Sequence, residues 1–395
     1  MAQSRTIVMD KPMQQADIGI PKNSLSTRIL WLDFAKSYGM ILVFLGHILE
    51  SLSQHDFTSA FLTYKAIYSF HIPLFFLLSG YISKPPKGSF AKYISIRISS
   101  RIVPFVFFNI LGLMGRILLD LASKNLNFTA YLSDSLSLLR GVPAFNITTW
   151  FLACLFAVEV VHFVVCRILK SERSRLLAAA LLFGLGWFVT LENRELAMNL
   201  WFFPEAMVAY IFYISGSVLR HSNYFNDGDA KPESSISKDA IGFWVSFIIM
   251  LLTFNLNESL FYHELPKVVF MGLSSHGQPL LFLITGLAGS LATIYLARWS
   301  ASSQSLSSLQ NRLGIKFIGL NTLVLLGLNG LLMPFNYKLA GKLASVLPDQ
   351  PFIVLPLSLG LAAISLAICV PLVLGLKRFL PQFVGLYRPS AKLTQ

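Results

Sequence analysis

Charged side chains are scarce in this chain. Only 13% of the residues are Asp, Glu, Lys or Arg, whereas 54% are hydrophobic. A soluble domain carries about 25% charged residues, so the chain lacks the polar surface that a water-soluble globule needs. Because the apolar runs extend from one end to the other, the composition excludes a series of soluble domains and predicts one membrane domain with short loops.

Cysteine is equally scarce, and its spacing excludes two kinds of site. Cys154 and Cys166 lie in one apolar segment and Cys369 lies far from both, which gives neither a disulfide framework nor a paired-cysteine metal pattern. The sequence also has no phosphate-binding glycine loop, no GxGxxG motif and no GxSxG motif. A nucleophilic-serine mechanism would therefore rest on Ser79 alone.

The net charge of +13 at first suggests a nucleic-acid partner. The basic residues form no single stripe or tail, however; they lie at alternate loops between apolar segments, which is typical of membrane proteins. We therefore expect no nucleic acid among the partners. The first 30 residues are polar, so we expect the first apolar segment to act as the insertion signal rather than a cleaved peptide.

About 20 apolar residues are needed for one membrane-crossing helix. By that measure the sequence predicts ten spans, at 34–52, 61–82, 102–121, 149–168, 175–191, 205–220, 240–256, 278–297, 317–334 and 352–376. Lys and Arg favour the loops on one side by roughly three to one, which places both ends of the chain in the cytoplasm.

We thus expect an all-α polytopic bundle in three parts, which are a cytoplasmic tail (1–33), a ten-helix membrane domain (34–376) and a second cytoplasmic tail (377–395). The polar stretches at 221–239 and 300–308 have linker composition and are expected to be loops or disordered. Trp201, Phe202 and Phe203 suit an interfacial aromatic belt or a loop folded back into the protein.

Ionisable residues inside a membrane are costly, and each is a functional candidate. In the first span, Lys36 and His47 are eleven residues apart, so they share one helix face with about 16 Å between them along the axis. Asp33 lies on the same side. A snorkelling interfacial pair also explains Asp33 and Lys36, and an interhelical hydrogen bond also explains His47.

Two further spans carry candidate polar groups. His71 precedes Pro73 in the second span, near the expected depth of His47, although a purely structural histidine remains an alternative. Arg97 and Arg101, one helical turn apart at the cytoplasmic end of the third span, suit phosphate recognition or ordinary positive-inside anchoring.

Glu159 lies in the middle of the fourth span, where a carboxylate needs Lys36, a histidine or a proton as its partner. His162, one turn later, is a weaker candidate, as is Glu205. The outer-loop residues His263, Glu264 and His276 are explained by solvation and have no metal-ligand spacing, so we expect no metal.

The sequence resembles a known family, the acyltransferase-3 family of membrane O-acyltransferases, in particular its branch of fucose and exopolysaccharide O-acetylases. The resemblance runs over residues 28–376 and rests on the order and spacing of several motifs. These are WLDFAKSYGMILVFLGH (31–47), FHIPLFFLLSGY (70–81), RISSRIVP (97–104), TWFLACLFAVE (149–159), FPEAMVAYIFYISGSVLR (203–220), HGQPLLFLITGLAGSL (276–291) and GLNTLVLLGLNGLL (319–332).

The resemblance implies ten helices in the bacterial inner membrane and transfer of an acyl group from cytoplasmic acyl-CoA to a sugar hydroxyl of a glycan or lipid-linked precursor. Acetyl-CoA is then a donor substrate, and no cofactor is bound permanently. His47 matches the proposed base, His71 the second-helix histidine, Lys36 a position where many members have arginine, and Arg97 and Arg101 the basic pair. Many members have a histidine where this chain has Asn329, so a role of that histidine is in doubt here.

Together these arguments predict a site with Lys36, Arg97 and Arg101 binding the coenzyme A phosphates. The catalytic candidates are His47, His71, Glu159 and Asp33. Neutral His47 would remove the proton of the acceptor hydroxyl. His71, Glu159 or a protonated carboxylate would orient His47, because Asp33 is too far from His47 to do so directly. Direct transfer is favoured because no activated nucleophile is apparent. A transporter or flippase for a glycolipid or small anion remains the alternative.

Overall fold

The computed structural model describes residues 29–86, 88–192, 201–222, 225, 232–258 and 268–385. Over these ranges the chain is helical, without strands, and one isolated β-bridge joins Phe270 and Ser275. Eight helical stretches are long and apolar enough to cross a membrane: Leu30–Ser53, Thr58–Ile82, Phe90–Ala122, Ile147–Ile168, Glu172–Leu191, Pro279–Ser302, Thr322–Ala344 and Pro351–Phe379. The all-α membrane bundle is therefore confirmed.

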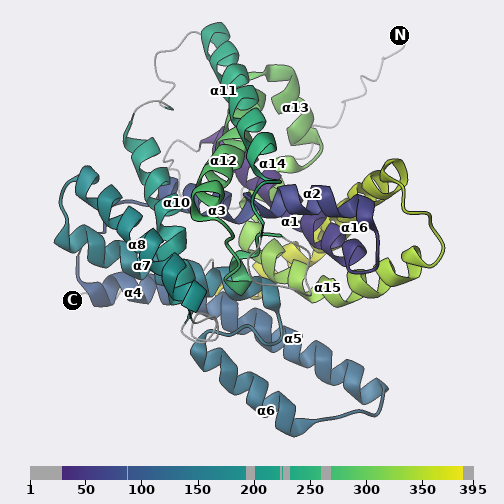
Figure 1. Ribbon diagram of the computed structural model, residues 1–395. Helices are drawn as coiled ribbons and strands as arrows, with labels where there is room; N and C mark the ends of the chain where they lie inside the picture. The colour runs from purple at the N-terminus through teal and green to yellow at the C-terminus, as the bar shows by residue number, and fades with distance from the viewer. Residues whose placement is uncertain are drawn as a thin grey trace, which may run out of the picture.

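Helix α1 (Leu30–Ser53) lies at the centre of the bundle (Figure 1). It packs against α2 (Thr58–Tyr68), α3 (His71–Ile82), α12 (Pro279–Ser302), α14 (Ile315–Leu320), α15 (Thr322–Ala344) and α16 (Pro351–Phe379). The other helices are α4 (Phe90–Arg97), α5 (Val103–Ala122), α6 (Phe128–Ser137), α7 (Trp150–Ile168), α8 (Glu172–Glu192), α10 (Phe203–His221), α11 (Pro232–Thr253) and α13 (Gln304–Arg312). The central position of α1 places its polar residues between other helices.

Each of the ten predicted spans falls on helical residues, but α10 and α11 are not among the eight apolar stretches. The count of ten and the cytoplasmic position of both ends therefore stay predictions. Two predicted loops were wrong in part. Within 300–308 the chain continues to the end of α12 and begins α13, whose N-terminus is capped by the Ser303 side chain, and within 221–239 helix α11 begins at Pro232.

The predicted second span is two helices rather than one. Helix α2 ends at Tyr68 and α3 begins at His71, with Ser69 and Phe70 between them. Pro73 has no N–H to donate to the carbonyl four residues back, and a proline is tolerated in the first turn of a helix. The break therefore places His71 at the start of α3, where its side chain can reach a backbone carbonyl of α2.

The third span also departs from a regular α-helix. A π-helical turn at Ile98–Ile102 joins α4 to α5, and it contains Arg101. Pro104 follows it and lacks the N–H that would bond the Ser100 carbonyl, which favours a wider turn at this place. π-turns inside α-helices occur frequently at functional sites.

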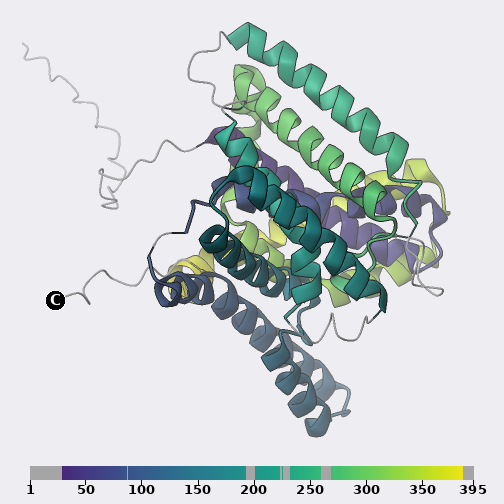
Figure 2. The same ribbon diagram turned by 60° about the vertical axis from the view of Figure 1, so that its left-hand side comes forward.

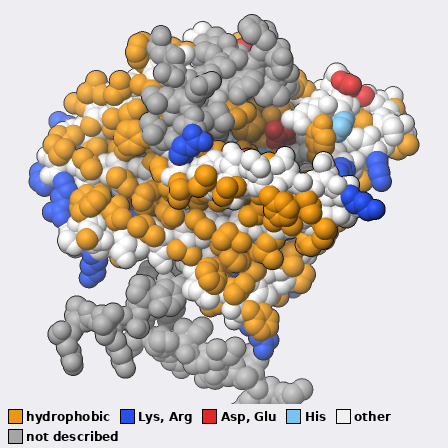
Figure 3. Space-filling model, turned by 90° about the horizontal axis from the view of Figure 1, so that it is seen from below, with side chains coloured by type: hydrophobic (Ala, Val, Ile, Leu, Met, Phe, Trp, Pro, Cys, Tyr) orange, Lys and Arg blue, Asp and Glu red, His pale blue; other side chains and the backbone are white. Residues whose placement is uncertain are grey.

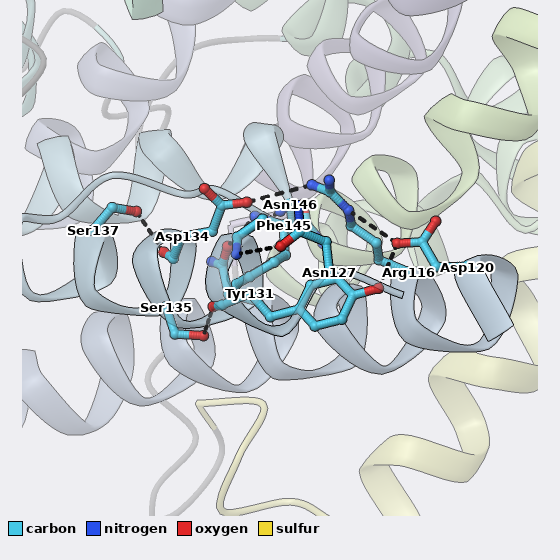
Figure 4. A network of polar contacts seen from close by, with 11 residues as sticks. Arg116, Asp120, Asn127, Tyr131, Asp134, Ser135, Ser137, Phe145 and Asn146 are labelled. Atoms are coloured by element: carbon cyan, nitrogen blue, oxygen red, sulfur yellow. Dashed lines mark hydrogen bonds and ion pairs between the residues drawn. The ribbon is translucent and has the colours of Figure 1, made fainter. Parts of the chain in front are cut away.

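Helices α5 and α6 form a hairpin that projects from the rest of the bundle in both ribbon views (Figures 1 and 2). Polar contacts join its two arms (Figure 4): the Arg116 guanidinium lies 3.6 Å from Asp120 and 3.4 Å from Asp134, and the Tyr131 hydroxyl donates to Asp120 at 2.7 Å. At its base Asn109 accepts from the backbone of 145–146. These two carboxylate partners explain how Arg116 is tolerated near the end of a span.

The predicted ninth span, 317–334, is interrupted, because α14 ends at Leu320 and α15 begins at Thr322. Asn321 between them donates to the Phe317 carbonyl at 2.6 Å and accepts from Lys377 at 2.7 Å. An asparagine side chain that bonds nearby backbone competes with the helix and favours such a break. The membrane-crossing part of this region is therefore α15.

Trp201 and Phe202, directly before α10, fold toward the protein, which is one of the two alternatives expected for these aromatic residues. Trp201 and Phe202 both have left-handed backbone conformations, and the Trp201 N–H donates to the Arg140 carbonyl at 3.0 Å. Phe202 is buried, whereas Phe203 is exposed.

Apolar side chains dominate the face of the molecule in Figure 3, with Lys and Arg at its edges. Large exposed apolar residues include Leu118 of α5, Leu181 of α8 and Ile364 of α16. Exposed apolar surface on this scale matches a protein surrounded by lipid.

Candidate active site

A cavity of about 170 Å³ lies inside the bundle beside α1. Lys36 and His47 both line it, as their shared helix face predicts, and His71 lines it from α3. The segment 269–272 and residues of α7 and α15 complete its walls. Arg101 lines it as well, so the structure brings four of the predicted site residues to one cavity.

His47 is held by a carboxylate that the sequence analysis did not single out. Its Nδ1 lies 2.9 Å from Oε2 of Glu50, three residues later on α1. Because a carboxylate only accepts, Nδ1 carries the hydrogen in this contact, and in the neutral imidazole Nε2 is then the acceptor. The His47 and Glu50 side chains are 13% and 11% exposed, so the pair is shielded from bulk solvent but still accessible.

Tyr68 completes this arrangement from the last turn of α2. Its hydroxyl donates to the same Glu50 oxygen at 2.6 Å and lies 2.9 Å from Nδ1 of His47. We expected His71, Glu159 or a protonated carboxylate to orient His47; in the structure Glu50 and Tyr68 make the contacts with Nδ1. The sequence does contain a signal for Glu50, because a carboxylate three residues after a histidine on a helix is close enough to contact it.

His71 is buried, and its Nδ1 lies 2.9 Å from the Ile67 carbonyl. A carbonyl only accepts, so Nδ1 donates and Nε2 of the neutral ring is an acceptor. At the break between α2 and α3 this carbonyl also accepts from the Phe70 N–H at 3.3 Å, so the imidazole shares it with the backbone. His71 also packs against the Tyr68 ring, with 4.7 Å between ring centroids, so both histidines contact the same tyrosine.

The two predicted arginines meet Glu159. Nη2 of Arg101 lies 3.1 Å and Nη1 of Arg97 lies 3.5 Å from the same Glu159 oxygen, Oε1. Tyr93 supports them, because its ring lies under the Arg97 guanidinium at 4.8 Å and its hydroxyl donates to the Glu159 carbonyl at 3.1 Å. Glu159 thus has the cationic partners that a buried carboxylate needs. In these contacts the cations are two arginines, whereas the sequence analysis had named Lys36, a histidine or a proton.

One carboxylate beside two guanidinium groups leaves this cluster with a net positive charge. The other Glu159 oxygen and Nε of both arginines are buried without a hydrogen-bond partner among the described residues. A second cavity, of about 350 Å³, lies here and is lined by Arg97, Arg101, Glu159 and Lys84. Guanidinium groups that line a cavity are suited to binding an anion.

The two cavities adjoin. Ser79, Ile82 and Arg101 line both of them, so the cavity of the histidines and the cavity of the arginine cluster meet at these three residues. Asp33 is separate: it is buried near the start of α1, its carbonyl accepts from Ser37, and it lines neither cavity.

The weaker candidates lie elsewhere. His276 is buried rather than solvated as expected, because Asn257 and Trp187 bond the backbone carbonyls of His276 and Gly277 and fold the loop inward. Burial lowers the pKa of His276 to about 3. Glu205 accepts from the Ser274 hydroxyl. His263 and Glu264 fall outside the described residues.

Asn329 is buried in α15, and its side-chain amide has no hydrogen-bond partner in the part of the chain that the structure describes. His162 lies beside Cys166 and the Tyr210 hydroxyl. Neither residue lines the cavity that holds His47.

Comparisons with known proteins give a consistent result. The model of the acyltransferase-3 family, described as an acyltransferase domain, matches residues 29–376. The chain is 34% identical over 86 residues to Nodulation protein NolL of Sinorhizobium fredii (strain NBRC 101917 / NGR234), and 35% identical over 86 residues to Nodulation protein NolL of Mesorhizobium japonicum. Each match covers 21% of this chain and about a quarter of the relative, 24% and 23% respectively. No solved structure matches.

Proposed function

This chain belongs to the acyltransferase-3 family and has helices that are long and apolar enough to cross a membrane. From that premise we propose that it is a membrane acyltransferase, which transfers an acyl group, acetyl in the simplest case, from acyl-CoA to a sugar hydroxyl. The acceptor is a surface glycan or a lipid-linked precursor. One observation carries the proposal: a histidine oriented by a carboxylate lies in a cavity that adjoins a second, cation-lined cavity.

His47 is the general base of this proposal. With Nδ1–H donated to Glu50, Nε2 is the atom that accepts the proton of the sugar hydroxyl. The hydroxyl oxygen then attacks the thioester carbonyl carbon, the carbon–sulfur bond breaks, and His47 returns the proton to the departing coenzyme A thiolate. Glu50 stabilises the imidazolium formed between these two proton transfers.

His71 has a different task in this scheme. Its Nδ1 is committed to the Ile67 carbonyl, so the neutral ring offers an acceptor and no donor to the cavity. It therefore suits a hydrogen bond from an acceptor hydroxyl. Negative charge on the thioester oxygen is better met by the cations that line the same cavity, Lys36 and Arg101.

The donor enters from the arginine cluster. Coenzyme A carries several phosphate groups, and Lys84, Arg97 and Arg101 at the second cavity provide the cations to bind them. Lys36 lines the inner cavity with Arg101. In this proposal the arginines lie on the cytoplasmic side of a bacterial inner membrane, and the acceptor binds on the side of the segment 269–272.

The proposal is tested with inside-out membrane vesicles that contain the protein and receive acetyl-CoA labelled in the acetyl group. We expect label in the glycan fraction together with an equal amount of free coenzyme A, and neither product with His47→Ala at the same protein level. A transporter or flippase would leave the donor intact. Full transfer by the purified His47→Ala variant would refute the base assignment.

A further inference from the structure

Ser79 lies at the junction of the two cavities. Three residues line both cavities: Ser79, Ile82 and Arg101. Of these, Ile82 is apolar and Arg101 is paired with Glu159. Ser79 is therefore the neutral hydrogen-bonding group at the point where a molecule must pass from the cations to the histidines.

The Ser79 hydroxyl has no hydrogen bond in the part of the chain that the structure describes. A serine inside a helix commonly bonds the carbonyl four residues earlier. Ser37, Ser290 and Ser358 do so here, at 2.8, 2.6 and 2.7 Å. Ser79 does not satisfy its hydroxyl in this way, and it is partly exposed at the cavity walls. Its donor and acceptor are thus available to a molecule that occupies the two cavities.

The position of Ser79 is fixed by the packing of α3 on α10. A Cβ on Gly80 would lie 1.8 Å from the Tyr213 carbonyl oxygen, and one on Gly216 would lie 1.9 Å from that of Leu77. These glycines allow the two backbones to touch, as small residues do between membrane helices. The face of α3 turned to the cavity is consequently held in place, and along it lie Ile72, Phe75, Ser79 and Ile82.

We propose that the Ser79 hydroxyl binds an amide of the pantetheine arm of the acyl donor. This inference rests on the proposed function and specifies how the donor is held. Ser79 is about 12 Å from His71 along α3, at 1.5 Å per residue. The arm has amide groups between its thioester and its phosphates, and a buried amide without a hydrogen bond is unfavourable. A neutral hydroxyl in an otherwise apolar stripe matches that part of the donor.

Two donors separate this contact from phosphate binding. Acetyl-pantetheine keeps the thioester and both amides of acetyl-CoA but lacks the nucleotide and its phosphates. In inside-out vesicles, we expect Ser79→Ala to raise the apparent KM about three- to tenfold for both donors, the size of one hydrogen bond between neutral groups. Arg97 lines the second cavity but not the first, so replacing it with Gln should raise the KM for acetyl-CoA and leave that for acetyl-pantetheine unchanged.

Matched variants show whether the effect belongs to the hydroxyl at this position. Ser79→Thr keeps a hydroxyl and should retain a KM near that of the wild type. Ser215→Ala on α10 removes a half-buried serine whose hydroxyl already bonds the Ile211 carbonyl, and should change neither KM. Binding of acetyl-pantetheine to purified protein, measured by calorimetry, gives the same comparison without turnover.

Three results would overturn the inference. They are unchanged KM values in Ser79→Ala, a change confined to acetyl-CoA, and an acetyl group found covalently on Ser79 of the wild type by mass spectrometry. If wild-type vesicles label no glycan and release no thiol from either donor, the proposed function fails instead.

Discussion

The carboxylate of Glu50 and the imidazole of His47 lie one turn apart on α1, with 2.9 Å between Oε2 and Nδ1. Tyr68 reaches the same oxygen from the neighbouring helix. A histidine that is fixed through Nδ1 presents Nε2 in one orientation, which is what a general base requires. The structure therefore supplies the orienting group that Asp33, in a different part of α1, cannot supply.

Glu50→Gln should lower kcat by about 100-fold, because the amide keeps the shape of the side chain but cannot stabilise an imidazolium with a negative charge. Initial rates of labelled acetyl transfer at saturating acetyl-CoA measure this. Glu172→Gln, a change of the same chemistry at an exposed glutamate, is the control. A Glu50→Gln enzyme with wild-type kcat would remove Glu50 from the mechanism.

Tyr68→Phe should reduce kcat about three- to thirtyfold and leave the KM for acetyl-CoA unchanged. The hydroxyl holds the Glu50 oxygen at 2.6 Å, so its loss loosens the carboxylate that orients His47 without touching the donor route. Kinetics with varied donor concentration separate the two parameters. A raised KM with normal kcat would instead mean that Tyr68 contacts the donor.

Glu159→Gln should mainly lower stability and should leave kcat at saturating donor within about threefold. Breaking a fully buried ion pair costs about 3–5 kcal/mol; because Arg97 and Arg101 are 22% and 19% exposed, we expect about 1–2 kcal/mol here. Thermal unfolding in detergent and donor-saturated kinetics provide the two readouts. A large loss of kcat in a protein that remains stable would show that Glu159 takes part in catalysis, as the sequence analysis predicted.

The sequence predicted what a single helix determines by itself. Lys36 and His47 face one cavity because eleven residues make slightly more than three full helical turns. Arg97 and Arg101 converge on one oxygen for a similar reason, since residues four apart are neighbours on a helix. Glu50 was within the reach of the same argument, because it follows His47 by three residues.

Contacts between distant segments were not predictable in this way. The partners of Glu159 come from another helix, and the periodicity of α7 contains no information about them. The break before His71 depends on where the chain places Pro73 relative to a turn, which hydropathy does not show. The inward fold of the loop at His276 depends on Asn257 and Trp187, which belong to other segments.

Asp349→Asn should destabilise the protein at neutral pH. The Asp349 carboxylate accepts from Thr58 N–H at 2.8 Å and its hydroxyl at 2.6 Å, and from Ser59, so it caps the N-terminus of α2 from the α15–α16 loop. These hydrogen bonds, mainly from Ser59, lower the pKa of Asp349 below its ordinary 3.8. The folded pKa is the lower one, so the stabilisation is complete above about pH 4 and is lost as the pH falls through the folded pKa.

The difference in melting temperature between wild type and Asp349→Asn, measured in detergent, should therefore be largest near pH 7 and shrink below about pH 4. Asp134→Asn, in the α5–α6 hairpin, provides a comparison at another partly exposed carboxylate. A difference that stays constant over this range would show that the carboxylate charge does not contribute to the cap.

His276→Leu should make the protein less sensitive to mild acid. Burial lowers the pKa of His276 from 6.5 to about 3, so between these values the unfolded chain binds a proton that the folded chain does not. Stability then falls as the pH decreases from about 6.5 toward 3, by about 1.4 kcal/mol per pH unit, or about 2 kcal/mol at pH 5. Leucine removes this dependence and also replaces an imidazole whose two nitrogens have no partner among the described residues. Thermal unfolding at pH 7.5 and pH 5 should show a smaller loss for the variant than for the wild type. Equal losses in wild type and His276→Leu would mean that His276 becomes protonated without cost, and hence that the loop opens to water.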